Sequence, residues 1–192
     1  HQGRQPIVES LEMGELRYEN TFRATPIAVP YRPLRVTPKP VVEGVQTAIV
    51  TGPSGEEIYT DNYGRVKVQF PWDREGQKND KTSCWMRVGQ ISAGAGWGAV
   101  WIPRIGFEVI VHFIEGDPDR PIILGSVYNA ANMPPYPLDA EKTKSTIKSN
   151  SSKGGGGFNE YRFEDKKGSE EIYQHGEKDL TIVTNNDKNQ ST

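Results

Sequence analysis

Between Tyr59 and Asn132 the chain consists of short apolar runs that are interrupted by glycines, and none of these runs has a helical period. A run of a few residues is long enough for a β-strand but too short for an α-helix. Glycines between such runs supply turns in which the backbone φ angle is positive. This pattern predicts a small closed β-barrel, and we interpret the flanking segments as attachments to it.

Apolar and polar residues alternate over 65–70, and 108–114 places Val109, Val111 and Phe113 on one face and a half-apolar set, Glu108, Ile110, His112 and Ile114, on the other. A period of two places one set of side chains in the core and the other set outside. Short apolar runs predict further strands at 43–51, 84–88, 99–102 and 122–128. Five or six short strands over about ninety residues, without a helical segment, fit a barrel like the OB-fold.

The character of the sequence changes outside the barrel and sets the expected domain boundaries. The first segment carries four Glu between Glu9 and Glu19, followed by five prolines between Pro26 and Pro40, which favour an extended chain. Farther along, 142–157 is rich in Lys, Ser, Thr and Gly and too poor in apolar residues to fold alone. We therefore expect an exit segment or linker at 1–42, the barrel at 43–135, a Pro/Ser/Gly-rich linker at 136–158 and further β structure at 159–192.

The last segment, 159–192, contains three short strand patterns with few apolar residues, at 161–163, 171–175 and 180–183. A ribbon with so little core is marginally stable alone, and its free edges invite pairing with other chains. Several copies that wind around one axis would pair those edges and bury the apolar residues. We interpret 159–192 as the start of an intertwined β-helix, and a frayed terminal hairpin is the alternative.

Charge and cysteine content limit the classes of partner and compartment. The barrel segment carries 8 basic and 11 acidic residues, a net charge of −3, whereas a nucleic-acid-binding barrel normally has a basic face. We therefore expect no nucleic-acid partner. The single cysteine, Cys84, excludes an intramolecular disulfide and suits a reducing compartment. Its place in a strand predicts a small buried side chain.

No apolar run approaches the roughly 20 residues that a membrane-spanning helix needs. No signal peptide is visible at the start of the sequence. The chain begins at His1 rather than at a Met, so we expect it to be a piece of a longer protein, and the missing signal peptide then carries little information.

Two glycine-rich stretches resemble phosphate-binding loops only superficially. The stretch Gly94–Gly98 lacks a glycine at the next required position, which is Ala99, and no helix follows it. The stretch Ser152–Gly157 has the order of a phosphate loop reversed and follows no apolar strand. We interpret both as structural loops.

Titratable residues do not form a catalytic or metal-binding pattern. The histidines His1, His112 and His175 are far apart and lack ligand spacing, although three copies of His175 could meet on the axis of a threefold tail. Asp117 and Asp119 lie on a turn and are expected to cap it, with the following arginine pairing one of them. We expect no catalytic residue, no cofactor-binding residue, no metal ligand and no cofactor, and hence no enzyme activity.

Several long motifs in a fixed order carry a resemblance to a known family. They are Tyr59-Thr-Asp-Asn-Tyr-Gly-Arg-Val-Lys-Val-Gln-Phe-Pro-Trp-Asp73, Gly96-Trp-Gly-Ala99, Ile102-Pro-Arg-Ile-Gly106, Glu115-Gly-Asp-Pro-Asp-Arg-Pro121 and Tyr128-Asn-Ala-Ala-Asn-Met-Pro-Pro-Tyr136. They resemble the VgrG family, the spike proteins of type VI secretion systems, which are related to the hub-and-spike proteins of contractile phage tails. The stretch 31–40 resembles the exit from the family's hub, and 161–168 the beginning of its needle.

The resemblance implies a homotrimer with an OB-fold below the hub and a β-helix needle that a contracting sheath drives through a target membrane. It also implies an Hcp tube behind the spike, a PAAR-type tip in front and effector proteins carried along. The protein would reside in the bacterial cytoplasm before firing and then be secreted or injected. Phage relatives place a lysozyme domain between barrel and needle, but 136–158 is too short for an enzyme, so that activity is not carried over.

Our principal hypothesis is a mechanical module, the neck between hub and needle of a puncturing spike. The structural residues it depends on are the glycine turns, Trp97, Trp101, Pro103 and the strand Tyr161–Phe163. A hypothesis of a different class is a barrel that binds oligonucleotides or another ligand, which needs an exposed aromatic and basic face. A third is an enzyme whose activity comes from a domain outside these residues.

Overall fold

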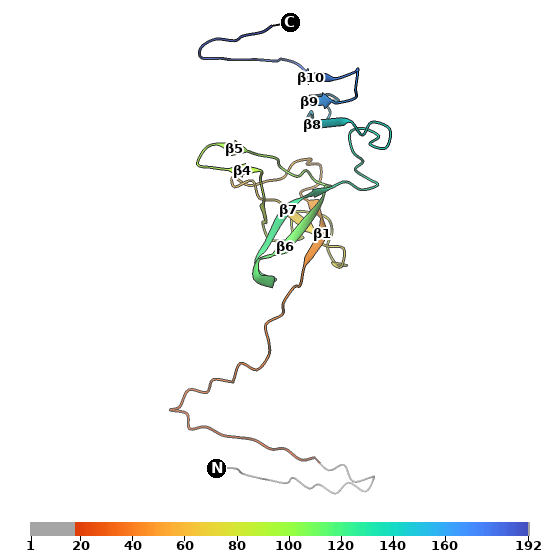
Figure 1. Cartoon of the computed structure of the whole chain (residues 1–192). Coiled ribbons are helices and arrows are strands. Elements are labelled where there is room, and N and C mark those ends of the chain that lie inside the picture. Colours follow the sequence, from red (N-terminus) through yellow and green to blue (C-terminus); the bar gives the residue numbers. More distant parts are fainter. Residues whose placement is uncertain (1–17, 192) are drawn as a thin grey trace. The chain divides into compact units, whose positions relative to one another are not determined.

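The computed structural model describes residues 18–191, in which the regular secondary structure is β-strand apart from one short 3-10 segment, and loops join the strands (Figure 1). The chain divides into two units, His1–Lys39 and Pro40–Thr192, which are considered separately. In the first unit, residues 18–39 form no helix or strand, as the prolines predict, and make one turn in which the Val29 N–H donates to the Pro26 carbonyl. His1 and most of the acidic run that starts at Glu9 lie outside the described residues.

A five-stranded sheet forms the first part of the second unit. Its strands are β1 (Val45–Thr51), β2 (Lys67–Gln69), β3 (Arg87–Val88), β6 (Glu108–Phe113) and β7 (Pro121–Val127), in the order β2-β1-β6-β7-β3. All pairs are antiparallel except β3 with β7. A bridge between Val66 and Met86, with hydrogen bonds of 3.1 and 2.8 Å in both directions, joins the two outer strands. The expected closed barrel is confirmed.

The barrel core consists of the apolar sides of the alternating strands. The buried residues are Ala48, Val50, Val66, Val68, Met86, Val109, Val111, Phe113 and Ile123. The alternation predicted for 65–70 and 108–114 therefore places the expected faces inward. After β6 the chain turns through a short 3-10 segment, η1 (Ile114–Gly116), where Gly116 adopts a φ of 69°. A Cβ on Gly116 would lie 2.6 Å from the Val41 side chain, so the close approach also requires a glycine.

We expect Val111→Ala to lower the free energy of unfolding by about 2 kcal/mol, because it removes two buried carbon atoms and leaves a cavity at the barrel centre. The matched control is Val45→Ala on β1, where the side chain is exposed and the expected change is within about 0.5 kcal/mol. Thermal unfolding at one fixed chain concentration measures both. Equal effects of the two changes would contradict the assigned core.

Two of the predicted barrel strands are shorter than expected. Only Arg87–Val88 of 84–88 is a strand, since pairing with the barrel begins at Met86. The expectation of a buried Cys84 is wrong: Cys84 is exposed because it lies in the loop before that pairing starts. Within 99–102 only Ala99 belongs to a strand, β5 (Gly98–Ala99), which forms a small separate hairpin with β4 (Ser92–Ala93).

A second sheet has three antiparallel strands in the order β10-β9-β8 (Figure 1). Its strands are β8 (Lys144–Asn150), β9 (Phe158–Glu164) and β10 (Glu171–His175). β8 lies within the predicted linker 136–158, and the structure differs there because pairing along all of β9 orders a segment that has little apolar content.

The predicted strand at 180–183 is not formed in the single chain, where Leu180, Ile182 and Val183 are exposed. A strand at this position needs a pairing partner, and the described part of the chain offers none beyond β10. Residues 18–191 contain no helix that is long and apolar enough to cross a membrane.

Candidate assembly interface

The register of the second sheet sorts its side chains onto two faces of opposite character. One face, here called the polar face, carries Lys144, Thr146, Lys148, Glu160, Arg162, Glu164, Glu171, Tyr173 and His175. The other, here called the apolar face, carries Ile147, Tyr161, Phe163 and Ile172 together with Ser145, Ser149 and Gln174. Cross-strand partners lie on the same face, so each set forms a continuous surface.

The polar face is covered by its own chain, which satisfies most of its polar groups, although the buried Arg162 Nε has no hydrogen-bond partner. Tyr136, which precedes the sheet, lies over it and donates its hydroxyl hydrogen to Glu160, which is only 5% exposed. Thr146 also donates to Glu160, at 2.8 Å, and Arg162 donates to the Tyr136 hydroxyl at 2.9 Å and to Glu171 at 2.9 Å. These contacts fix the position of the tyrosine and bury a carboxylate with three partners around it.

Cation–π contacts reinforce the same cluster. The Arg162 guanidinium lies 4.3 Å from the Tyr173 ring centroid and 5.6 Å from that of Tyr136. The ammonium groups of Lys144 and Lys148 lie 4.7 and 5.6 Å from the Tyr136 centroid. Each of the three cations attracts the Tyr136 ring, and together these contacts hold the segment before β8 against the sheet. The polar face therefore needs no partner molecule.

Burial raises the pKa of Glu160, but the hydrogen bonds from Tyr136 and Thr146 and the charges of Lys148 and Arg162 outweigh it, so the pKa lies below its ordinary value of 4.5. A carboxyl whose pKa is lower in the folded state stabilises the fold above the unfolded pKa. This contribution is lost as the pH falls through the folded pKa.

We therefore expect thermal stability to fall as the pH drops below the ordinary carboxyl pKa of 4.5 and Glu160 becomes protonated. Glu160→Gln is expected to flatten that part of the profile because the titrating group is gone. Scans of the melting temperature against pH measure both proteins. Parallel profiles for the two would show that Glu160 does not carry the acid sensitivity.

The apolar face, in contrast, has no cover from the described part of the chain. Ile147 is 56% exposed and Ile172 is 66% exposed, while Tyr161 and Phe163 touch each other edge to face with ring centroids 5.0 Å apart. The outer edges of β8 and β10 are also unpaired within residues 18–191. An apolar surface flanked by free strand edges is suited to association with other chains.

The apolar face continues toward the barrel through Trp101. This residue lines a pocket of about 230 Å³ together with Ile147, Tyr161 and His175. Closer to the barrel, Arg104 binds Glu57 and donates to the Asn150 carbonyl at 2.8 Å, so one guanidinium joins the barrel to the end of β8. The exposed apolar surface and the barrel are thus mechanically connected.

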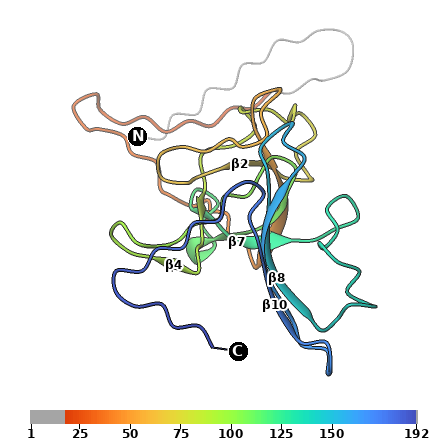
Figure 2. The same cartoon turned by 90° about the horizontal axis from the view of Figure 1, so that it is seen from above.

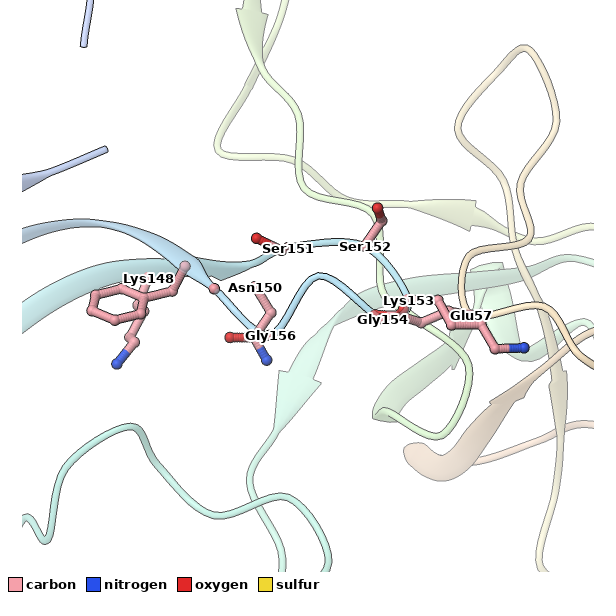
Figure 3. Close-up of a pocket in the computed structure, with 10 residues that line it drawn as sticks. Glu57, Lys148, Asn150, Ser151, Ser152, Lys153, Gly154 and Gly156 are labelled. Carbon is pink, nitrogen blue, oxygen red and sulfur yellow. The ribbon is translucent and has the colours of Figure 1, made fainter. Parts of the chain in front are cut away.

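A second pocket, of about 290 Å³, lies at the joint between barrel and sheet (Figure 3). It is lined by Glu57 and Lys148 and by the loop 150–158, which contains the four consecutive glycines. Lys153 donates to the Gly55 carbonyl at 2.6 Å, and Glu57 accepts a hydrogen bond from Arg104. The charged groups of Lys153 and Glu57 therefore already have partners. This loop joins β8 to β9 within the second sheet and contacts the barrel through the Lys153 hydrogen bond.

Comparison with known proteins identifies both parts of the second unit. Residues 47–128 match the family model of the type VI secretion system/phage-baseplate injector OB domain. Residues 145–192, which contain nearly all of the second sheet and the 180–183 segment, match the bacteriophage T4 gp5 C-terminal trimerisation domain.

Curated proteins with these domains are similar over most of the chain. The type VI secretion system spike protein VgrG1b of Pseudomonas aeruginosa is 60% identical over 160 residues, which are 82% of this chain and 22% of that protein. VgrG1c of the same organism is 55% identical over 177 residues, 91% of this chain and 24% of that protein. The chain belongs to the VgrG family. It spans less than a quarter of the length of these two relatives.

A further VgrG relative has a name that includes an activity. The actin cross-linking toxin VgrG1 of Vibrio cholerae is 47% identical over 190 residues, which are 98% of this chain and 17% of that protein. The similarity covers the OB and trimerisation domains, so the shared part is the spike and the family resemblance in the sequence is confirmed.

The structure places the residues singled out in the sequence in different surroundings. Pro103 is buried, whereas Trp97 and Trp101 are exposed. Tyr161–Phe163 lies within β9, and the rings of Tyr161 and Phe163 form the edge-to-face pair. Asp117 caps its turn, since its carboxylate accepts the Asp119 N–H at 3.0 Å, as expected. Arg120 pairs with Glu115 at 3.3 Å.

The two histidines among residues 18–191, His112 and His175, lie on strands of different sheets. His175 belongs to the polar face, where its ring stacks on Phe158 with centroids 4.4 Å apart and Nδ1 lies 3.0 Å from the Phe158 carbonyl oxygen. It thus lies on the opposite side from the apolar face, which gives no support to a cluster of three His175 side chains on an axis. His112 is half-buried on β6.

The cations beside the barrel aromatics are engaged within the chain. Arg65, near the Tyr63 ring, pairs with Asp61 at 2.7 Å, and Lys67, 5.0 Å from the Trp85 ring centroid, donates to the Asp80 carbonyl. An oligonucleotide-binding face needs cations that are free to meet phosphates. The alternative of a nucleic-acid-binding barrel gains no support from these residues.

Proposed function

We propose that this chain is the neck of a homotrimeric puncturing spike, in which three copies associate through their apolar faces. The observation that carries the proposal is the exposed apolar surface of Ile147, Phe163 and Ile172 on the segment that matches a trimerisation domain. Burying such a surface in each of three copies supplies the main driving force for association. It also leaves the satisfied polar face outside.

The free strand edges support an intertwined arrangement. β8 and β10 each have one edge that pairs with no strand among residues 18–191, and the apolar segment 180–183 forms no strand there. Pairing these segments between copies continues the β structure as a needle whose interchain hydrogen bonds run along its length. A needle built in this way resists bending, as mechanical penetration requires.

The remaining parts of the proposal follow from the family. We propose an exit from the hub at 1–42, the barrel at 43–135, and a needle that begins with β8. The partners would be an Hcp tube, a PAAR-type tip and effector proteins, all contacted mainly through parts beyond these residues. The protein would act mechanically rather than as an enzyme, and would pass from the bacterial cytoplasm into the medium or the target cell when the apparatus fires.

A truncation tests where the trimer is held together. We expect glutaraldehyde to link the 192-residue chain into a three-chain species on a denaturing gel. A chain that stops at Thr143, and so lacks the whole second sheet, should remain a single-chain species under the same conditions. The same cross-linked pattern for both chains would place the contact in the barrel and overturn the proposed role of the apolar face.

A further inference from the structure

The β4–β5 hairpin is held rigidly by its own backbone. The Gly94 N–H donates to the Trp97 carbonyl at 2.8 Å to close the tip. Gly98 has a φ of 140°, and a Cβ there would lie 2.5 Å from the Ser92 carbonyl oxygen, so the two strands approach closely. At the base, the Gln90 side-chain amide donates to the Trp101 carbonyl at 3.1 Å and accepts the Trp101 N–H at 2.9 Å.

The side chains of this hairpin are apolar and exposed. Ile91 is 88% exposed, Trp97 72% and Val100 73%. The hairpin projects from the barrel in both views (Figures 1 and 2). Exposed large apolar groups that gather on one rigid element mark an interaction site rather than ordinary surface.

The composition of the segment points the same way. From Val88 to Pro103 there is no charged residue, although 25% of the whole chain is charged. Depletion of charge together with aromatic side chains is the compositional feature of the buried centre of a protein interface. Ser, Ala and Gly make up the rest of the hairpin and allow another backbone to approach closely.

We propose that in the assembled spike this hairpin docks against a second copy of the chain, as a contact additional to the apolar face. The proposal rests on the trimeric function above. The second copy is the occupant because the hairpin is continuous with the apolar face: Trp101 at its base lines the same pocket as Ile147 and Tyr161. The hairpin therefore extends the interchain surface from the needle to the barrel and couples the barrels to one another.

The test uses the 192-residue chain with a photoreactive phenylalanine analogue in place of Trp97. Irradiation is expected to produce a two-chain species on a denaturing gel, with the linked peptide derived from a second copy. The matched control carries the same analogue at Tyr63, which is 77% exposed on the barrel but lies among charged neighbours, and is expected to yield no interchain species. Light scattering on each sample gives the mass before irradiation.

The outcomes separate the two proposals. A trimeric mass without interchain linkage at position 97, or with equal linkage at position 63, overturns the hairpin contact and leaves the spike intact. A monomeric mass overturns both. A second variant, Trp97→Ser combined with Ile91→Ser, is expected to raise the chain concentration at which the trimer half-dissociates by about tenfold or more. Tyr63→Ser should leave that concentration unchanged, and an unchanged concentration for the double variant contradicts the proposal.

Discussion

Ile147→Asp is expected to convert the trimer into monomers. The side chain lies on the edge strand β8 of the apolar face, opposite Tyr161, and is 56% exposed in the single chain, so the charge is tolerated there. In the trimer the same carboxylate would be removed from water without a partner, at a cost of several kcal/mol in each of three copies. Light scattering on a sizing column measures the change in mass.

The matched control for this change is Leu124→Asp on β7, where an aliphatic side chain of similar exposure, 53%, lies on the barrel surface. We expect the control to remain trimeric. The circular dichroism spectrum of both variants should retain the β signal, which separates dissociation from unfolding. If Ile147→Asp stays trimeric, or if both variants dissociate equally, the apolar face is not the surface that joins the chains.

Glu160→Leu is expected to lower the free energy of unfolding by about 3–5 kcal/mol. Glu160 is buried and accepts hydrogen bonds from Tyr136 and Thr146, and its carboxylate lies 3.9 Å from the Arg162 guanidinium. Replacing the carboxylate leaves a buried hydroxyl hydrogen without an acceptor and part of the arginine charge unpaired. Thermal and denaturant unfolding at one fixed chain concentration measure the loss.

Glu171→Leu provides the comparison, because Glu171 binds the same Arg162 at 2.9 Å from a half-exposed position. Its expected effect is about 0–1 kcal/mol, since water replaces the lost partner. Because both carboxylates contact Arg162 and differ in burial, the difference between the two losses of stability measures the effect of burial. Equal losses for the two variants would show that the covered polar face does not contribute as described.

The barrel was largely predictable from sequence because its strands obey local rules. Val109, Val111 and Phe113 recur at every second position and form the inner face of β6, while the other face carries Glu108, Ile110 and His112. Closure of the barrel depends on the Val66–Met86 bridge between distant segments, and no local pattern shows that contact. For the same reason Cys84 was placed in a strand although pairing begins two residues later.

The second sheet was less predictable because its order comes from cross-strand pairing rather than from apolar content. β8 reads as a polar linker, and only its partner β9 makes it a strand. A signal was nevertheless present: Lys144, Thr146 and Lys148 alternate with Ser145 and Ile147, and Glu160 and Arg162 flank Tyr161 with the same period. Alternating charges of this kind on two neighbouring segments predict a sheet with one ionic face.

The two faces together explain how a sparse sequence can form a stiff element. The charged groups of the polar face are paired largely within each chain, so this face can remain outside when chains associate. The apolar face is exposed to solvent in a single chain and stabilises the structure only when other copies cover it. Arg104 joins the end of β8 to the OB domain through a hydrogen bond to the Asn150 carbonyl.

The mass of the 192-residue chain in solution tests the central claim most directly. Light scattering on a sizing column, over a range of concentrations, should give three times the 21.4 kDa of one chain. That mass would establish that the described segments are sufficient for the threefold assembly. A clean 21.4 kDa species at high concentration would contradict the claim that the apolar face of the second sheet holds three copies together.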